Sequence, residues 1–280
     1  MCYASLDLYS ERIVSVMDIK FISSLTCVNL LNVTYLVSLH IVLSLTACGS
    51  VSDPLPSGIE GPEAERLADQ LLSVIKAESF ERAEGAQWTF RSHRYLWHRG
   101  LGRVRVSLED DLHVYLDLKA QRGWSLEAGV RPEPSEESEH VADAIKAFNN
   151  DSFWAFAPFK VRDGGTTRAH VRDPETKRSA LLIHYRTGGS TPGDHYLWHL
   201  DKEGRPERWQ MWVSIIPVGG VSSTWSEWRE TRSGAWVATE HRFRGGVSLR
   251  LEDIEITERF EQLGVSAPKL TGQWPSLSPQ

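Results

Sequence analysis

Cysteine is scarce in this chain of 280 residues. Its three cysteines are Cys2, Cys27 and Cys48, so none follows position 48. A disulfide needs two cysteines, and a thiolate metal site needs several. Residues 49–280 therefore have neither an internal disulfide nor a cysteine metal site.

An excess of charge is missing as well. The chain has 31 basic and 37 acidic side chains, a formal net charge of −6, and no run of five like charges. Proteins that bind along a nucleic-acid backbone need a concentrated basic face. The composition therefore predicts that nucleic acid is not a partner.

Signatures of catalysis and of cofactor binding are also missing. Ser152 follows Asp151 but lacks the Gly-x-Ser-x-Gly turn of hydrolases, and the glycine pairs fit turns rather than a phosphate loop. His195 and His199 lie in a strand-like stretch, where a spacing of four separates two residues by about 13 Å. That is too far for both to hold one metal ion. We therefore expect no enzyme: no catalytic residue, no cofactor and no metal site.

One apolar stretch does occur near the N-terminus. Residues 28–45 are mostly apolar, but Asn29, Asn32 and His40 interrupt them. A membrane-spanning helix has fewer polar breaks, so the stretch fits the core of a signal peptide. We expect residues 1–47 to be this signal peptide. Residues 1–16 are expected to reflect a mis-assigned start, because acidic side chains stand where a signal peptide is usually positive.

A lipidation pattern follows directly. Leu45, Thr46, Ala47 and Cys48 resemble the bacterial lipobox, in which two small residues precede the cysteine whose thiol is acylated. Residues 48–62 are rich in Gly, Ser and Pro and are expected to form a solvated tether. The pattern predicts lipidation at Cys48 and membrane association through N-terminal acyl groups. An uncleaved anchor and an ordinary secretory signal are the alternatives.

The residue after the acylated position indicates a location. It is Gly49, whereas an aspartate there usually retains proteobacterial lipoproteins in the inner membrane. We therefore expect the bacterial cell envelope, at the outer membrane facing the periplasm, if the source is Gram-negative.

Alternating apolar residues dominate the rest of the chain. About eleven segments show the period of two that is typical of half-buried strands, and short connections join them. Residues 63–84 and 135–148 have the spacing of amphipathic helices. The patterns predict a mainly β fold with α-helices, an open antiparallel half-barrel capped by helices, over residues 63–264. Residues 265–280 are expected to be a C-terminal tail.

One aromatic segment, residues 149–163, lacks alternation and joins two β-rich halves. Asp151 is placed to cap a short helix that Pro158 stops. Its aromatic side chains include Trp154, Phe156 and Phe159. They require apolar surroundings, so they either plug a core or line a cavity for an apolar ligand as part of its gate.

Eleven tryptophans, all after residue 87, are a further feature of this chain. Many lie in different strand segments, and a curved sheet would bring their faces together. The set either packs a large core or lines a concave apolar cavity. Besides Trp154, Phe156 and Phe159 of the joining segment, which has four aromatic residues in all, the residues expected at this cavity are Trp124, Trp198, Trp209 and Trp212.

These features resemble the LolA/LolB-like group of periplasmic lipoprotein-handling proteins. The resemblance lies in the leading helix (residues 63–84), the antiparallel meander, an inserted helical plug, and a closing pair of segments (residues 234–241 and 247–256). Uncharacterised bacterial lipoproteins with an Asn-Asp-Ser-Phe-Trp…Ala-Pro-Phe-Lys segment are similar too, and residues 150–154 and 157–160 carry that segment here. The resemblance implies an unclosed, LolA-like barrel that holds acyl chains in its hollow.

The sequence therefore predicts a membrane-anchored envelope lipoprotein that binds a lipid or an acylated ligand in an aromatic-lined cavity. One alternative is a non-catalytic structural or protein-interaction lipoprotein with an envelope protein as its partner. Another is a lipid-ester hydrolase, which would need a serine, a histidine and an acid together at the cavity mouth.

Overall fold

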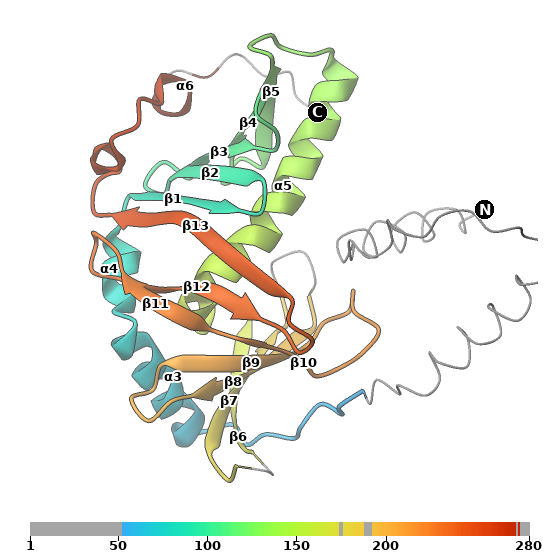
Figure 1. Ribbon diagram of the computed structural model, residues 1–280, viewed down its shortest axis with the longest axis vertical. Helices are drawn as coiled ribbons and strands as arrows, with labels where there is room; N and C mark the ends of the chain where they lie inside the picture. Colours follow the sequence, from blue (N-terminus) through green and yellow to red (C-terminus); the bar gives the residue numbers. More distant parts are fainter. Residues whose placement is uncertain (1–51, 174–175, 188–191, 273, 275–280) are drawn as a thin grey trace, which may run out of the picture. The chain divides into compact units, whose positions relative to one another are not determined.

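The structure is a computed structural model that describes residues 52–173, 176–187, 192–272 and 274 (Figure 1). The expected signal peptide and Cys48 lie outside the described residues. Within the described residues, no helix combines the length and the apolar character needed to cross a membrane.

Two open antiparallel sheets form the body of the fold. The first has the strand order β11-β12-β13-β1-β2-β3-β4-β5, and the second has the order β10-β9-β8-β7-β6. The strands of the first sheet are β1 (Gly85–Phe90), β2 (His93–His98), β3 (Arg103–Ser107), β4 (Leu112–Asp117), β5 (Arg122–Glu127), β11 (Ser226–Glu230), β12 (Trp236–Arg242) and β13 (Ser248–Thr257). Those of the second are β6 (Thr166–Arg172), β7 (Ser179–Tyr185), β8 (Asp194–Leu200), β9 (Pro206–Trp212) and β10 (Val221–Thr224).

Helices cover the inner faces of both sheets. The helical elements are α3 (Pro62–Val74), α4 (Ala77–Arg82), α5 (Pro134–Phe156), η1 (Ala157–Lys160), η2 (Phe260–Leu263) and α6 (Pro268–Thr271). Helix α5 packs on β4, β5 and β12, and α3 packs on β6 and β7. In Figure 1, α5 runs diagonally behind the first sheet toward the second. Its apolar side therefore supplies core to both sheets.

The expectation of a mainly β, open antiparallel fold with helices is confirmed. The expected number of about eleven strands is corrected to thirteen among the described residues, divided between two sheets. The division falls at Trp225, which is 2% exposed and separates β10 from β11. The strand before it pairs with β9 and the strand after it pairs with β12. A bridge between Ser223 and Phe243 connects the two sheets beside this point.

Two expected helices have different bounds. Residues 63–84 do not form one helix, because Lys76 adopts a left-handed conformation (φ 53°) between α3 and α4. A single left-handed residue interrupts the α-helical repeat. Asp151 does not cap a short helix, since α5 continues through it to Phe156. Main-chain N–H groups within a helix already bond to carbonyls one turn earlier, which leaves the carboxylate of Asp151 for other partners.

The C-terminal tail is partly attached to the domain. Helix α6 and Trp274 pack on the outer face of the first sheet, and Leu270 is fully buried there beside Trp124. The Arg103 guanidinium also donates to the Gly272 carbonyl at 3.0 Å. Prolines and serines are frequent in residues 265–280, and in the sequence they obscured the apolar residues that make these contacts.

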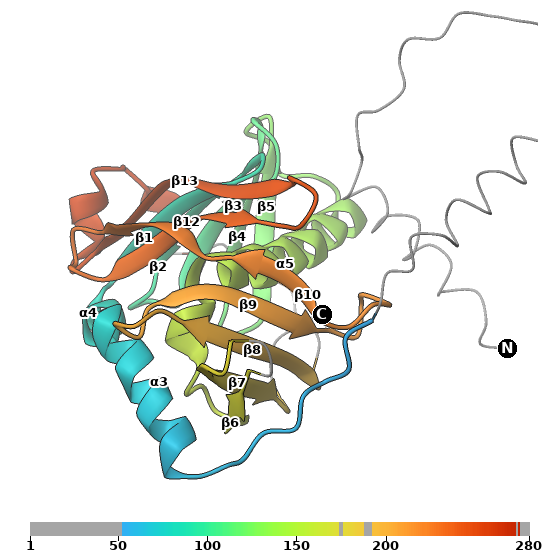
Figure 2. The ribbon, with the colours of Figure 1, turned by 60° about the horizontal axis from the view of Figure 1, so that its bottom comes forward.

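The expected solvated tether is also attached where the structure describes it. Residues 52–59, here called the strap, run along the outer face of the second sheet (Figure 2). At one end the Trp212 indole donates to the Asp53 carbonyl at 2.7 Å. At the other end Ile59 and His170 exchange two main-chain hydrogen bonds of 2.8 Å. The strap is therefore exposed to solvent but fixed at both ends.

Candidate functional site

The interior between the two sheets holds a set of aromatic rings. We call it the interior aromatic cluster, and it consists of Trp88, Phe153, Trp154, Phe156, Phe159, Trp198, Trp209 and Trp225. Several of its rings come from one continuous stretch at the end of α5 and in η1. We call this stretch, residues 151–160, the plug segment.

Trp209 on β9 is a centre of the cluster on the side of the second sheet. Its ring centroid lies 5.0 Å from those of Trp154, Trp198 and Trp225, and 5.8 Å from that of Phe153. The Phe153 pair is stacked and the other three are tilted or edge-on, and aromatic pairs at such distances in these geometries are favourable contacts. Trp209 is 1% exposed, so the plug segment and the sheet are closely packed here.

The plug segment makes similar contacts toward the first sheet. Phe156 meets Trp88 edge-on at 5.0 Å, and Phe159 stacks on Phe80 of α4 at 4.2 Å. Phe156 is buried, whereas Phe153, Trp154 and Phe159 keep part of their surface exposed. The plug segment therefore fills the interior with its own rings and reaches solvent at three of them.

The structure brings together Trp154, Phe156, Phe159, Trp198 and Trp209 of the expected cavity residues, but not the other two. Trp124 faces the outer side of the first sheet, where it stacks on Tyr115 at 4.3 Å. Trp212 faces the outer side of the second sheet and bonds to the strap. Successive side chains of a strand point to opposite faces.

The interior also contains aromatic residues that the sequence did not single out. Phe153, Trp88 and Trp225 belong to the cluster, and the imidazole of His241 lies 4.3 Å from the Trp225 ring. Alternation along a strand could have grouped Trp88 with Phe90. It could not have shown which of the two faces turns inward.

The hollows on the described surface include two beside the second sheet. The larger, about 340 Å³, is open to solvent, and Trp212, His195 and Ile216 are among the residues that line it. The smaller, about 20 Å³, lies beside His199 and Arg208. Neither hollow is lined by a member of the interior aromatic cluster.

A buried carboxylate holds α5 to the first sheet. Asp151 is 3% exposed, and its Oδ2 accepts hydrogen bonds from the Tyr95 hydroxyl (2.5 Å) and from His93 Nδ1 (3.0 Å) on β2. The Asn150 amide donates to its Oδ1 at 2.8 Å. Burial, followed by the adjacent Asp151 charge, raises the pKa of Tyr95 well above its usual value. Tyr95 therefore stays a neutral donor, and Asp151 fixes the start of the plug segment.

Ser152, the neighbour of Asp151 in the chain, bonds elsewhere than to the Asp151–His93 pair. The Ser152 hydroxyl donates to the Asn149 carbonyl at 3.5 Å, and Ser152 is buried in α5. The arrangement of Asp151 and His93 therefore resembles a structural tie more than a hydrolytic triad, in which the histidine bonds to the nucleophile.

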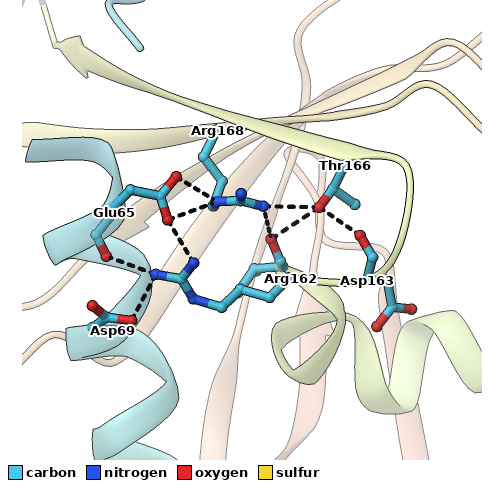
Figure 3. Close-up of polar contacts among 7 residues, drawn as sticks. Glu65, Asp69, Arg162, Asp163, Thr166 and Arg168 are labelled. Atoms are coloured by element: carbon cyan, nitrogen blue, oxygen red, sulfur yellow. Dashed lines mark hydrogen bonds and ion pairs between the residues drawn. The ribbon is translucent and has the colours of Figure 1, made fainter. Parts of the chain in front are cut away.

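A network of charged groups holds the other end of the plug segment (Figure 3). Arg162 donates to Glu65 (2.5 Å) and to Asp69 (2.6 Å) on α3. Arg168 on β6 donates to the same Glu65 carboxylate at 2.9 Å and to the Val161 carbonyl at 3.1 Å. The network fixes the chain directly after η1 to α3 and to the second sheet.

Among the described residues, one group has the composition and spacing of metal ligands. The ligand atoms of Glu127, Glu136 and His140 lie within 4.8 Å of one another. Both glutamates are exposed, and His140 Nδ1 already contacts the Ser125 hydroxyl at 3.1 Å. His195 and His199 are engaged separately, since His195 stacks on a neighbouring imidazole and His199 bonds to Gln210.

Three indole N–H groups of the interior aromatic cluster lack a partner. Trp88 Nε1, Trp198 Nε1 and Trp225 Nε1 are buried and have no hydrogen-bond acceptor among the described residues. In contrast, Trp209 Nε1 donates to the Ser223 hydroxyl at 2.6 Å. An unpaired buried donor costs about 1–3 kcal/mol. The interior wall therefore offers hydrogen-bond donors that the fold itself does not use.

His241 gives the interior a dependence on pH. Burial lowers its pKa to about 4, against the smaller opposite effects of carbonyl contacts at Thr224 and Trp154 and of the Glu240 charge. The folded protein therefore favours the neutral imidazole, and stability is expected to fall as pH drops from about 6.5 toward 4. The loss amounts to about 3 kcal/mol for a shift of this size at 1.36 kcal/mol per pKa unit.

The measurement is urea unfolding of the full chain at several pH values between 7 and 4, followed by tryptophan emission. The variant His241→Gln keeps a side-chain donor toward the Thr224 carbonyl but has no proton to gain, so its stability should fall less over this range. Equal losses for the two proteins would show that other groups cause the acid sensitivity.

Comparison with known proteins adds no relative. No protein-family model matches this chain, and no curated protein is similar to it.

Proposed function

We propose that this chain is a membrane-anchored lipoprotein of the bacterial cell envelope that binds a lipid or an acylated ligand. Acyl groups on Cys48 would attach it to the outer membrane on the periplasmic side. The two sheets would act together as a LolA-like half-barrel, with the plug segment occupying its hollow. The proposal involves binding alone, without a chemical step.

The observation that carries the proposal is that the rings in the interior come from separate parts of the fold. The sheets contribute an aromatic wall, and a separate helical segment, not a third sheet layer, fills the space between them. An acyl chain that replaced Trp154 and Phe156 would meet the rings of Trp88, Trp198 and Trp209. Burial of apolar area contributes roughly 25 cal/mol per Å².

The unpaired donors favour an acylated ligand over a plain hydrocarbon. The indole N–H groups of Trp198 and Trp225 have no acceptor among the described residues. The carbonyl oxygen of an ester or an amide would accept such a hydrogen bond. A buried donor without a partner gains the most free energy when a ligand supplies its hydrogen-bond acceptor.

Binding in the interior requires the plug segment to move. Its rings are in contact with both sheets, and the ties at Asp151 and Arg162 hold its two ends. Exposed ion pairs contribute little, so the tie at Arg162 is the weaker one. We therefore expect the end near η1 to open first, with Phe159 leaving Phe80.

Photo-cross-linking tests the proposal. The full chain, purified in detergent, is irradiated with a phospholipid that carries a diazirine near the end of an acyl chain. Cross-links are expected on peptides of the plug segment and on inner residues of β8 and β9, and excess unlabelled phospholipid should remove them. Cross-links that survive competition, or that occur only on outer residues such as Trp212, would contradict interior binding.

A second function is favoured by the close packing of the same rings. With Trp198 and Trp209 almost fully buried, the domain would serve as a rigid, non-catalytic module that holds an envelope protein. This module would give no competable cross-link, and chemical cross-linking in cells would instead join it to one specific protein. The two functions are therefore distinguished by which cross-link forms.

A further inference from the structure

The start of the strap lies against the loop between β9 and β10 (Figure 2). The Gly219 N–H donates to the Ser52 hydroxyl at 2.9 Å, and Asp53 N–H donates to the Gly219 carbonyl at 3.1 Å. Gly220 has φ +77°, and a Cβ there would lie 2.5 Å from Asp53 Cβ. Only glycine accommodates both the conformation and this contact. The strap is thus held at a defined place on the domain.

The length of the preceding chain limits where the acylated cysteine can be. Cys48 is separated from Ser52 by four residue steps in the sequence. A fully extended chain covers at most about 14 Å over four residues. Acyl groups attached at Cys48 would therefore begin within that distance of Ser52.

The surface beside this point is uncharged and partly apolar. Residues 213–220, between β9 and β10, include no charged side chain, and Ile215 in this loop is 46% exposed. The neighbouring β12–β13 turn, residues 243–247, has Arg244 as its charged residue, and Val247 is 50% exposed. Antiparallel pairing of Ser223 with Phe243 places the turn next to the loop (Figure 1).

We propose that this loop and turn form a membrane-facing tip, which rests on the bilayer that holds the acyl groups of Cys48. The inference depends on the proposed lipidation of Cys48. Ile215 and Val247 enter the interfacial region, where burial of their exposed area adds to the anchoring. The lack of acidic groups in the loop and turn avoids repulsion from an anionic lipid surface. The domain therefore has a fixed orientation relative to the membrane.

Cysteine variants of the full chain test this orientation. Signal-peptide cleavage removes Cys2 and Cys27, and acylation blocks Cys48, so a thiol label attaches only to an introduced cysteine. The variants Ile215→Cys and Val247→Cys carry a bimane label in vesicles of phosphatidylethanolamine and phosphatidylglycerol with nitroxide-bearing acyl chains. The unsubstituted chain serves as the labelling control.

Leu101→Cys is the matched control for exposure and position. Leu101 is 42% exposed and lies in the turn after β2. Gly85 pairs with both His98 and Thr257, so this turn is at the end of β13 opposite to Val247. Strand β13 has ten residues, so its two ends are about 33 Å apart.

The expected result is a blue shift and a loss of emission at positions 215 and 247, with neither at position 101. Similar quenching at all three positions, or none at 215 and 247 in a vesicle-bound chain, overturns the membrane-facing tip while lipidation stands. Thiol labelling of the unsubstituted chain, together with its absence from vesicles, shows that Cys48 is not acylated. In that case the proposed anchoring fails, and the inference fails with it.

Discussion

Replacing Trp209 by alanine is expected to lower the free energy of unfolding by about 3–5 kcal/mol, the range for removing a large aromatic side chain from a core. Trp209 is 1% exposed and contacts rings from the plug segment and from β8. Its removal also leaves the Ser223 hydroxyl without the indole donor. Urea unfolding of the full chain, followed by circular dichroism, measures the change.

Trp212→Ala is the matched control on the same strand. The side chain is of the same type, but it faces the outer side and its indole bonds to the Asp53 carbonyl at 2.7 Å. We expect a loss near the 0.5–1.5 kcal/mol net value of one hydrogen bond, with additional loss from its partial burial. If the two variants were equally destabilised, the interior aromatic cluster would not be the main core of the second sheet. Trp209→Phe retains a ring and gives a second, milder variant if alanine prevents folding.

Replacing Cys48 by alanine is expected to move the protein from the membrane fraction to the soluble fraction, or to leave an uncleaved precursor. Each buried methylene of an acyl chain contributes roughly 0.8 kcal/mol, and a single chain is only marginal as an anchor. A lipobox implies several chains, so their loss should change the distribution almost completely. Fractionation of cells and the electrophoretic mobility of the chain measure the outcome.

Cys27→Ala is the control for this experiment, because the same substitution is made upstream of the expected cleavage site. The control should remain in the membrane fraction. A Cys48→Ala protein of mature size that still sediments with membranes would disprove anchoring through this residue. Incorporation of radioactive palmitate into the chain, present in the control and lost in Cys48→Ala, identifies the modification directly.

The two substitutions address independent parts of the proposal. Trp209 lies in the interior of the domain, whereas Cys48 precedes the strap. Loss of anchoring in Cys48→Ala should therefore leave the unfolding free energy nearly unchanged, and Trp209→Ala should remain acylated. This independence follows because sites without shared contacts have nearly additive effects.

The sequence by itself determined the local periodicity of the chain. Period-two alternation identified strands, and short connections indicated antiparallel neighbours, which is why the mainly β fold with open antiparallel sheets was predictable. The alternation also contained the difference between Trp209 and Trp212, because residues three positions apart in a strand face opposite sides, although both were expected at the same cavity. Residues that are close together in the sequence determine these properties.

Tertiary structure alone decided which face of each strand turned inward. Trp124 has the same alternation as other strand tryptophans, yet it packs under the C-terminal tail. Asp151 has the composition of a helix cap, but a tyrosine and a histidine from β2 bind it inside α5. Trp225 divides the strands into two sheets, and Trp212 fixes the strap. Each outcome depends on partners far away in the sequence, because a local pattern encodes the spacing of side chains but not what they contact.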